Sequence, residues 1–145
     1  MSSSINTGKV ILGGIAAGIV INVVCIIDNV VFLAARYAEE QHLGHFLTEP
    51  RIPFMPIWTV LMFLVGIALV WIYAAVRPRL GPGPGTALKV GLLVGLIAGV
   101  PWNTAGAAWS TYGKFFPFMW MCETVVGYTL GTLLGAWMYR EPAVS

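Results

Sequence analysis

Four apolar stretches constrain the fold of this sequence more than any other feature. They cover about residues 10–35, 55–76, 87–109 and 116–138, and crossing a bilayer as a helix takes about 20 residues. The chain is 58% hydrophobic and only 10% charged, whereas soluble domains carry about 25% charged residues. A backbone inside lipid must satisfy its own hydrogen bonds, which a helix does. We therefore expect an all-α membrane protein, a four-transmembrane-helix bundle that forms one domain over residues 1–145.

Small residues recur every four positions in three of these stretches. In the fourth stretch, Glu123 is followed by glycines at 127, 131 and 135. A step of four residues is slightly more than one helical turn, so such positions form one stripe, and glycine there lets a neighbouring backbone approach closely. The predicted helix-packing positions are Gly14, Gly18, Gly91, Gly95, Gly99, Gly127, Gly131 and Gly135.

Polar residues lie within the same stretches and fall at a similar depth. With alternating helix directions and a rise of about 1.5 Å per residue, most of them lie about 4 to 10 Å to one side of the membrane centre. We expect them to form a polar pocket that opens to the periplasm and narrows sharply toward the glycine stripes. Its predicted residues are Glu123, Asn103, Asn29, Asp28, Cys25, Asn22 and Thr59.

Glu123 is the expected centre of this pocket. An unpaired carboxylate at this depth costs about 2.5–3.5 kcal/mol on insertion scales. We expect it to be protonated, hydrogen-bonded to Asn29 or Asn103, or paired with a cation. Asp28 is expected at the rim, facing the outer interface or Arg36. One carboxylate on the stripe favours one proton, one cation or one polar head group over a metal site with two carboxylates. The alternatives are that these groups only join helices, or that they serve catalysis.

The basic residues predict an orientation. Lys9, Arg77, Arg79, Lys89 and Arg140 would lie on one side, and Arg36, Arg51 and Lys114 on the other together with Glu39, Glu40 and Glu49. By the positive-inside rule, both termini and the second loop are cytoplasmic. Trp71 and Trp137 would then lie at the inner interface, and Trp58, Trp109 and Trp120 nearer the outer one. Residues 1–7 are polar and uncharged, so we expect no cleavable signal peptide.

The connecting segments carry helix-ending signals. Asn6 or Thr7 can cap the first helix. Residues 36–53 should begin as an interfacial helical extension that the prolines at 50 and 53 end. The stretch from Arg77 to Gly85 is rich in proline and glycine, so we expect a stiff basic turn without regular structure. Pro101 should bend the third helix.

Histidines supply only a weak metal candidate. His42 and His45 lie three residues apart beside Glu39 and Glu40, and residues i and i+3 share a helix face. We interpret them as part of an exposed loop, and Cys25 and Cys122 as packing residues. The sequence therefore predicts no resident metal, no cofactor and no catalytic residue. The net charge of +2 is too small to indicate nucleic acid as a partner.

The two halves of the chain share a pattern. Residues 54–58 resemble residues 116–120, and Lys9-Val10 resembles Lys89-Val90. A duplicated two-helix hairpin would explain this pattern, and so would the recurrence of aromatic residues at membrane interfaces. The Arg77-Pro78-Arg79 turn, with Gly81-Pro82-Gly83-Pro84 and the Trp-x-Tyr-Arg ending, resembles a group of small four-span bacterial integral membrane proteins without an assigned function. The resemblance implies the fold and the bacterial inner membrane, and it supplies no activity.

Two classes of function fit these observations. The first is a non-catalytic accessory subunit or assembly partner, which would contact the lipid bilayer and other membrane-protein subunits or a second copy of itself. The second is a small transporter, or an ion- or proton-coupled carrier, that uses the site around Glu123. An enzyme ranks third, because no nucleophile and base can be placed together.

Overall fold

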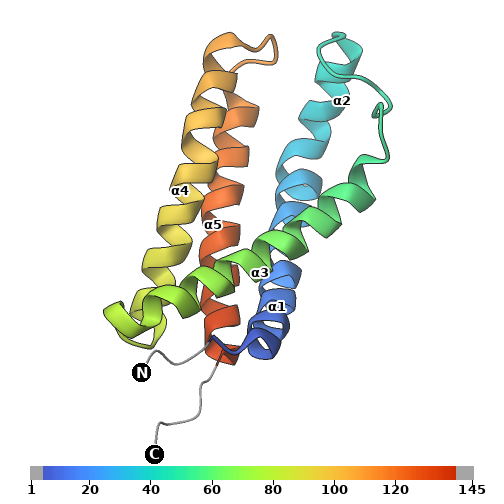
Figure 1. Ribbon diagram of the computed structural model, residues 1–145. Coiled ribbons are helices and arrows are strands. Elements are labelled where there is room, and N and C mark those ends of the chain that lie inside the picture. Colours follow the sequence, from blue (N-terminus) through green and yellow to red (C-terminus); the bar gives the residue numbers. More distant parts are fainter. Residues whose placement is uncertain (1–4, 140–145) are drawn as a thin grey trace, which may run out of the picture.

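The computed structural model describes residues 5–139, and all regular secondary structure in that range is helical (Figure 1). Its elements in chain order are α1 (Thr7–Ile27), the π-helical segment η1 (Asp28–Leu33), α2 (Ala34–His42), α3 (Phe54–Leu80), α4 (Pro84–Trp109) and α5 (Phe115–Met138). The first three run on from one another, so that residues 7–42 form one long helix with a wide turn inside it. As expected, Asn6 caps this helix, and its Oδ1 accepts a hydrogen bond from the backbone N–H of Lys9 at 3.1 Å.

Three of the helices are long and apolar enough to cross a membrane: Thr7–His42, Phe54–Leu80 and Pro84–Trp109. Their large apolar side chains are widely exposed on the outside of the bundle, including Ile19, Leu64 and Leu93. Exposed apolar side chains are stable when lipid surrounds them. The prediction of an all-helical fold with helices long and apolar enough to cross a membrane is thus confirmed for three of the four predicted spans. The fourth predicted span, residues 116–138, falls on α5.

The helices pack as two hairpins joined through α5. α1 packs against α3, α4 packs against α5, and α5 also packs against α1. Figure 1 shows the start of α1, the α3–α4 turn and the end of α5 at one end of the bundle, called the base below. α2 and the α4–α5 turn lie at the opposite end, called the top. The two hairpins agree with the predicted repeat, although the duplication itself stays a prediction.

Each glycine stripe faces a different neighbour. On α4, a Cβ placed on Gly91 would lie 2.6 Å from the Cα of Thr129, and one on Gly95 would lie 3.0 Å from the Cα of Val125, both on α5. On α5, a Cβ at Gly131 would lie 3.0 Å from the backbone oxygen of Ala17 on α1. These distances leave no room for a side chain, so backbones meet along the stripes. Gly127 is the exception, because a Cβ there would make ordinary contact with Val24 at 3.6 Å.

The stripe of α1 is shared between two neighbours. Gly14 and Gly18 lie against Ile67 and Phe63 of α3, and Gly66 of α3 lies against the backbone of both glycines. Gly13, one residue earlier, faces α5 instead, where its Cβ would lie 2.7 Å from the backbone oxygen of Gly135. Consecutive residues point about 100° apart on a helix, so two adjacent glycines allow two different helices to approach α1 closely. The sequence analysis missed Gly13 and Gly66, because neither belongs to a run of glycines four residues apart.

The turn predicted over Arg77–Gly85 is much shorter in the structure. α3 continues through Pro78 to Leu80, and α4 begins at Pro84, which leaves only residues 81–83 outside a helix. Proline at the first helical position loses no hydrogen bond, because the N–H group at this position has no partner within the helix, whichever residue is there. Gly81 and Gly83 adopt φ angles of 85° and 120°, which few other residues tolerate. Arg140 of the predicted basic side lies outside the described residues.

Candidate functional site

Two carboxyl groups meet inside the upper half of the bundle. Glu123 of α5 is 9% exposed and Asp28 of η1 is 5% exposed, and their side chains lie close enough to interact. The Oδ2 atom of Asp28 is buried and has no hydrogen-bond partner. Buried carboxyl groups ordinarily have a donor or an opposite charge beside them. This pair therefore forms an unusual site, which we call the carboxyl pair.

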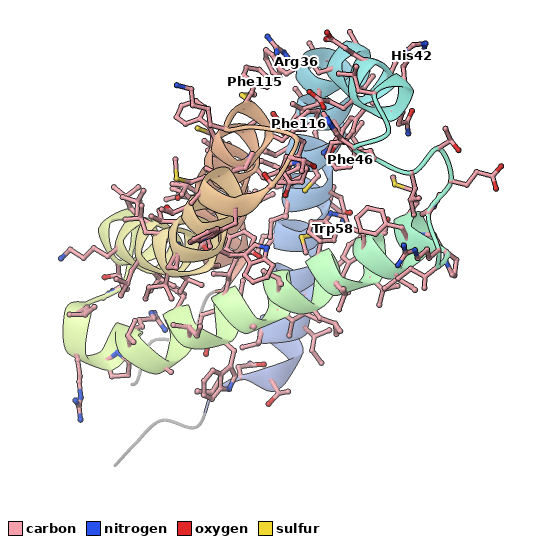
Figure 2. All side chains as sticks on the ribbon, turned by 90° about the horizontal axis from the view of Figure 1, so that it is seen from above. Arg36, His42, Phe46, Trp58, Phe115 and Phe116 are labelled. Atoms are coloured by element: carbon pink, nitrogen blue, oxygen red, sulfur yellow. The ribbon has the colours of Figure 1, made fainter. Side chains whose placement is uncertain are left out.

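The position of Asp28 corrects the expectation that it lies at the rim. The backbone N–H of Asp28 still bonds to the oxygen of Val24, so Asp28 keeps the helical direction set by α1, and α5 packs on that side. Asp28 thereby points toward Glu123 and not toward Arg36. The guanidinium carbon of Arg36 lies instead 3.9 Å from the ring centre of Phe115, and Figure 2 shows these two residues together at the top. The site thus holds two carboxyl groups, where the glycine stripe predicted one.

Neighbouring side chains orient Glu123. Asn29 donates from Nδ2 to Oε2 of Glu123 at 3.2 Å and also to the backbone oxygen of Cys25 at 2.9 Å. The thiol of Cys25 interacts with Glu123 and with the indole of Trp58. Three helical segments thus contribute to the site: α1, η1 and α5.

A chain of hydrogen bonds leads from the carboxyl pair toward the top. The hydroxyl of Tyr37 donates to Oδ1 of Asn29 at 3.1 Å, and the indole Nε1 of Trp120 donates to the same hydroxyl at 3.2 Å. The order is therefore Trp120, Tyr37, Asn29, Glu123. Each polar atom along it is paired, which fixes the side chains in one arrangement.

Aromatic rings surround the outer end of this chain. The aromatic cap consists of Tyr37, Phe46, Tyr112, Phe116 and Trp120. Phe46 stacks on Tyr112 at 4.8 Å and meets Phe116 edge-on at 5.1 Å. Figure 2 shows Phe46 and Phe116 side by side beneath α2. The cap joins α2 and the segment after it to the start of α5, so it holds the top of the bundle together.

The other predicted pocket residues lie apart from the carboxyl pair. Asn103 is buried on α4, where its Nδ2 donates to the backbone oxygen of Gly99 at 2.7 Å. It lines a groove of about 480 Å³ between α4 and α5. Gly99 faces Thr124 and Met121 on α5, so Asn103 meets a different face of α5 from the one that carries Glu123. No hydrogen bond joins Asn103 to Glu123 among residues 5–139.

Asn22 and Thr59 form a separate link between α1 and α3. Nδ2 of Asn22 donates to the backbone oxygens of Gly18 at 2.9 Å and of Thr59 at 3.4 Å. The Thr59 hydroxyl donates to the backbone oxygen of Met55 at 2.9 Å. Both side chains therefore donate to backbone oxygens of α1 and α3, and neither forms a hydrogen bond with the carboxyl pair among residues 5–139.

Toward the base, small residues close the bundle beneath the carboxyl pair. Gly131 and Gly135 of α5 lie against the backbone oxygens of Ala17 and Gly13 on α1. Ile21 lies between these contacts and the carboxyl pair and is 1% exposed. Helix backbones in contact leave no path for a solute, so access to the carboxyl pair is easier from the top.

Comparison with protein-family models, with curated proteins and with solved structures finds no match. Geometry alone therefore indicates what the site does.

The histidines of the segment after α2 do not assemble a metal site. His45 Nδ1 lies 2.6 Å from Oε2 of Glu40, and His42 points away from the bundle at the end of α2 (Figure 2). Within residues 5–139, no group of three or more His, Cys, Asp or Glu side chains has the geometry to hold a metal ion.

Sequence reasoning missed the aromatic partners of the site. It did not single out Tyr37, and it placed Trp58 and Trp120 at the outer membrane interface. The available signal was that Tyr and Trp hydrogen-bond donors seek a partner when they are buried, and that the polar residues of the same helices offered acceptors. The sequence contains no indication of which acceptor each would reach.

Proposed function

We propose that this chain is a four-span protein of the bacterial inner membrane that binds a proton at the carboxyl pair and acts as a small proton-coupled carrier. The observation that carries the proposal is the close approach of Asp28 and Glu123, both buried. Intramembrane carboxyl groups are costly, and in pumps and transporters they mark proton relays and ion paths.

The packing of α5 supports a fourth span. α5 has 24 residues and packs between α1 and α4, and it runs from the top to the base beside helices that are long and apolar enough to cross a membrane (Figure 1). Its threonines reduce its hydropathy, but the hydroxyls of Thr124, Thr129 and Thr132 donate to backbone oxygens four residues earlier, at 2.6–2.8 Å. Hydroxyls satisfied within their own helix are tolerated in lipid.

A bound proton resolves the electrostatic problem of the carboxyl pair. Two ionised carboxylates in contact repel strongly where the dielectric constant is low. One proton between them removes one negative charge and turns one carboxyl oxygen into a hydrogen-bond donor. Such a donor can supply the partner that the buried Oδ2 atom of Asp28 otherwise lacks. The pair then titrates as a unit, which binds and releases a single proton.

The π-helical segment supports a functional role for the site. π-helical turns are rare and occur frequently at functional sites. Here the wide turn contains both Asp28 and Asn29, and both of these residues interact with Glu123. Their hydrogen bonds lead through Tyr37 toward the top, which the positive-inside rule places on the periplasmic side.

Infrared spectroscopy of the protein in lipid vesicles tests the proposal. A protonated carboxyl group in an apolar site gives a C=O stretch that is distinct from that of a carboxylate. We expect this band in the wild-type protein at neutral pH and its loss in Glu123→Gln. The matched control is Glu39→Gln, the same change at an exposed carboxyl of α2, which should keep the band. A folded Glu123→Gln protein with an unchanged carboxyl band would refute proton binding at this site.

Transport is measured separately with a pH-sensitive dye trapped in the vesicles. An imposed pH gradient should decay faster with wild-type protein or Glu39→Gln than with Glu123→Gln. Decay at the rate of empty vesicles for all three proteins would refute a carrier that moves protons without a second substrate.

A second candidate is an accessory subunit that docks other membrane proteins. One observation favours it: the groove of about 480 Å³ between α4 and α5 is lined mostly by apolar residues, and Trp102 and Trp109 of α4 are 79% and 89% exposed. In native membranes solubilised with mild detergent, a subunit should migrate in a complex larger than one chain. Ala107→Trp, which fills the groove, should then release it, whereas Glu123→Gln should not.

A further inference from the structure

A cavity of about 400 Å³ opens at the base of the bundle. It is lined by Tyr73 and Arg77 of α3, Gly83 and Pro84 at the start of α4, and Leu133 and Trp137 of α5. The cavity lies far along the bundle from the carboxyl pair and belongs to no part of the proton site.

Hydrogen bonds fix the walls of this basal cavity. The hydroxyl of Tyr73 accepts from the backbone N–H of Gly83 at 3.1 Å, which ties α3 to the turn before α4. The hydroxyl of Tyr139 accepts from the backbone N–H of Asn6 at 3.3 Å. The two tyrosine rings meet edge-on at 6.2 Å. A cavity with walls held in this way is preformed, so a ligand need not order them on binding.

Among residues 5–139, the charged side chains near the basal cavity are basic. The basic residues at this end are Lys9, Arg77, Arg79 and Lys89, whereas the acidic residues of the described range are Asp28, Glu39, Glu40, Glu49 and Glu123, all nearer the top. Arg77 is in the cavity wall, with its guanidinium carbon 5.9 Å from the ring centre of Tyr139. The first turn of α4 adds the positive end of a helix dipole. Complementarity therefore favours an anionic occupant.

The apolar part of the wall indicates that this occupant is a lipid. Leu133 and Trp137 form one side of the cavity, and Trp137 is 66% exposed on the outside of the bundle. Trp71 is also exposed, and tryptophan side chains at the ends of membrane helices lie at the depth of the lipid head groups. A soluble anion would leave this apolar side without a contact, whereas an acyl chain would cover it.

We propose that the basal cavity binds the phosphodiester head group of an anionic glycerophospholipid of the cytoplasmic leaflet, with an acyl chain along Leu133 and Trp137. Basic pockets between membrane helices on that side are suited to anionic head groups. The bound lipid would join α3, α4 and α5 at the base, where the α3–α4 turn is the only covalent link between the two hairpins.

The test is lipid retention by the purified full-length chain in detergent. Phosphatidylglycerol is added, and bound lipid is counted by native mass spectrometry, with phosphatidylcholine and inorganic phosphate as comparison ligands. The decisive variants are Arg77→Gln and Arg79→Gln. Both remove one positive charge, but Arg79 is exposed and does not line the cavity. We expect Arg79→Gln to retain phosphatidylglycerol as the wild type does. We expect Arg77→Gln to bind it with an affinity at least about tenfold lower.

Two further arms cover the other outcomes. If Arg77→Gln fails to fold, Leu133→Trp fills the cavity without changing the charge and should lose the lipid. Equal retention of phosphatidylcholine, or equal loss in Arg77→Gln and Arg79→Gln, would overturn the head-group site. Thermal stabilisation by inorganic phosphate as large as that by phosphatidylglycerol would overturn the assignment to a lipid. Loss of the carboxyl band in Glu123→Gln bears on neither result, so the two proposals fail separately.

Discussion

Asn29 and Glu123 are 94 positions apart in the sequence, yet the amide of one lies 3.2 Å from the carboxyl oxygen of the other. The same amide group also holds the backbone oxygen of Cys25, so a single side chain fixes α5 to the helix that carries Asp28. The carboxyl pair is therefore positioned by Asn29 and is not a chance approach of two acids.

Asp28→Asn should stabilise the protein at neutral pH. The change removes one of two carboxyl groups in contact and gives Glu123 an amide donor in its place. A net hydrogen bond contributes about 1 kcal/mol, so the unfolding temperature in detergent should rise by a few degrees. Glu39→Gln, at an exposed carboxyl group, should leave it unchanged. A fall in the unfolding temperature of Asp28→Asn would mean that a bound cation, and not a proton, holds the two carboxyl groups together, because an amide can replace the hydrogen bond of a shared proton but not a carboxylate ligand.

Tyr37→Phe should destabilise the top of the bundle. Its hydroxyl is both a donor to Asn29 and an acceptor from Trp120, and removing it leaves two polar groups without a partner, at a cost of about 1–3 kcal/mol. Tyr112→Phe is the matched control, because Tyr112 belongs to the same aromatic cap but its hydroxyl makes no hydrogen bond within residues 5–139. Thermal unfolding followed by tryptophan fluorescence distinguishes them. Equal effects of the two changes would show that only ring packing matters there.

Gly91→Ala should weaken the contact between α4 and α5. The new Cβ would lie 2.6 Å from the Cα of Thr129, and forcing the helices apart costs about 1–3 kcal/mol. Gly85→Ala on the same helix is the control, because nothing lies within 4 Å of the position that its Cβ would take. That change should be neutral or stabilising by about 0.5–1 kcal/mol, since alanine favours a helix. Larger changes, Gly95→Leu and Gly131→Leu, should prevent stable purification. Detergent stability equal to wild type in Gly91→Ala would contradict close backbone packing.

Both termini should lie in the cytoplasm. Leu80→Cys places an exposed thiol at the base, and Leu47→Cys places one at the top. A membrane-impermeant maleimide added to whole cells should label the second and not the first, and lysis should expose the first. The native Cys25 and Cys122 are buried and half-buried within helices and should stay unlabelled. The reverse pattern would invert the orientation and move the carboxyl pair to the cytoplasmic half.

The helices and the glycine stripes could be predicted because both follow from local spacing. Apolar length determines a span, and a four-residue period determines a stripe, whatever lies opposite. The partner of each stripe could not be predicted in this way. Gly13 and Gly14 are adjacent, yet one faces α5 and the other α3, and only the three-dimensional arrangement of the helices decides which.

The candidate site was predictable in part for the same reason. Glu123, Asn29 and Cys25 stand out as polar residues in apolar stretches, and the structure brings them together. Asp28 was assigned a different direction because its place off the Asn22–Asn29 face does not say which neighbouring helix packs on that side. Asn103 was assigned to the site by depth alone, and depth does not say which face of α5 a residue meets.

The π-helical segment between α1 and α2 also contains one residue more than a regular α-helical turn would, within the long helix of residues 7–42. If this extra residue moves along the helix, everything beyond it turns about the axis, while the rest of the helix keeps its hydrogen bonds. If the π-helical turn moved past Asn29, α2 would rotate about the helix axis and Tyr37 would move away from Asn29. The carboxyl pair would then be uncovered without separation of the two hairpins, so in the proposed carrier a single rotation of this helix end would open the site.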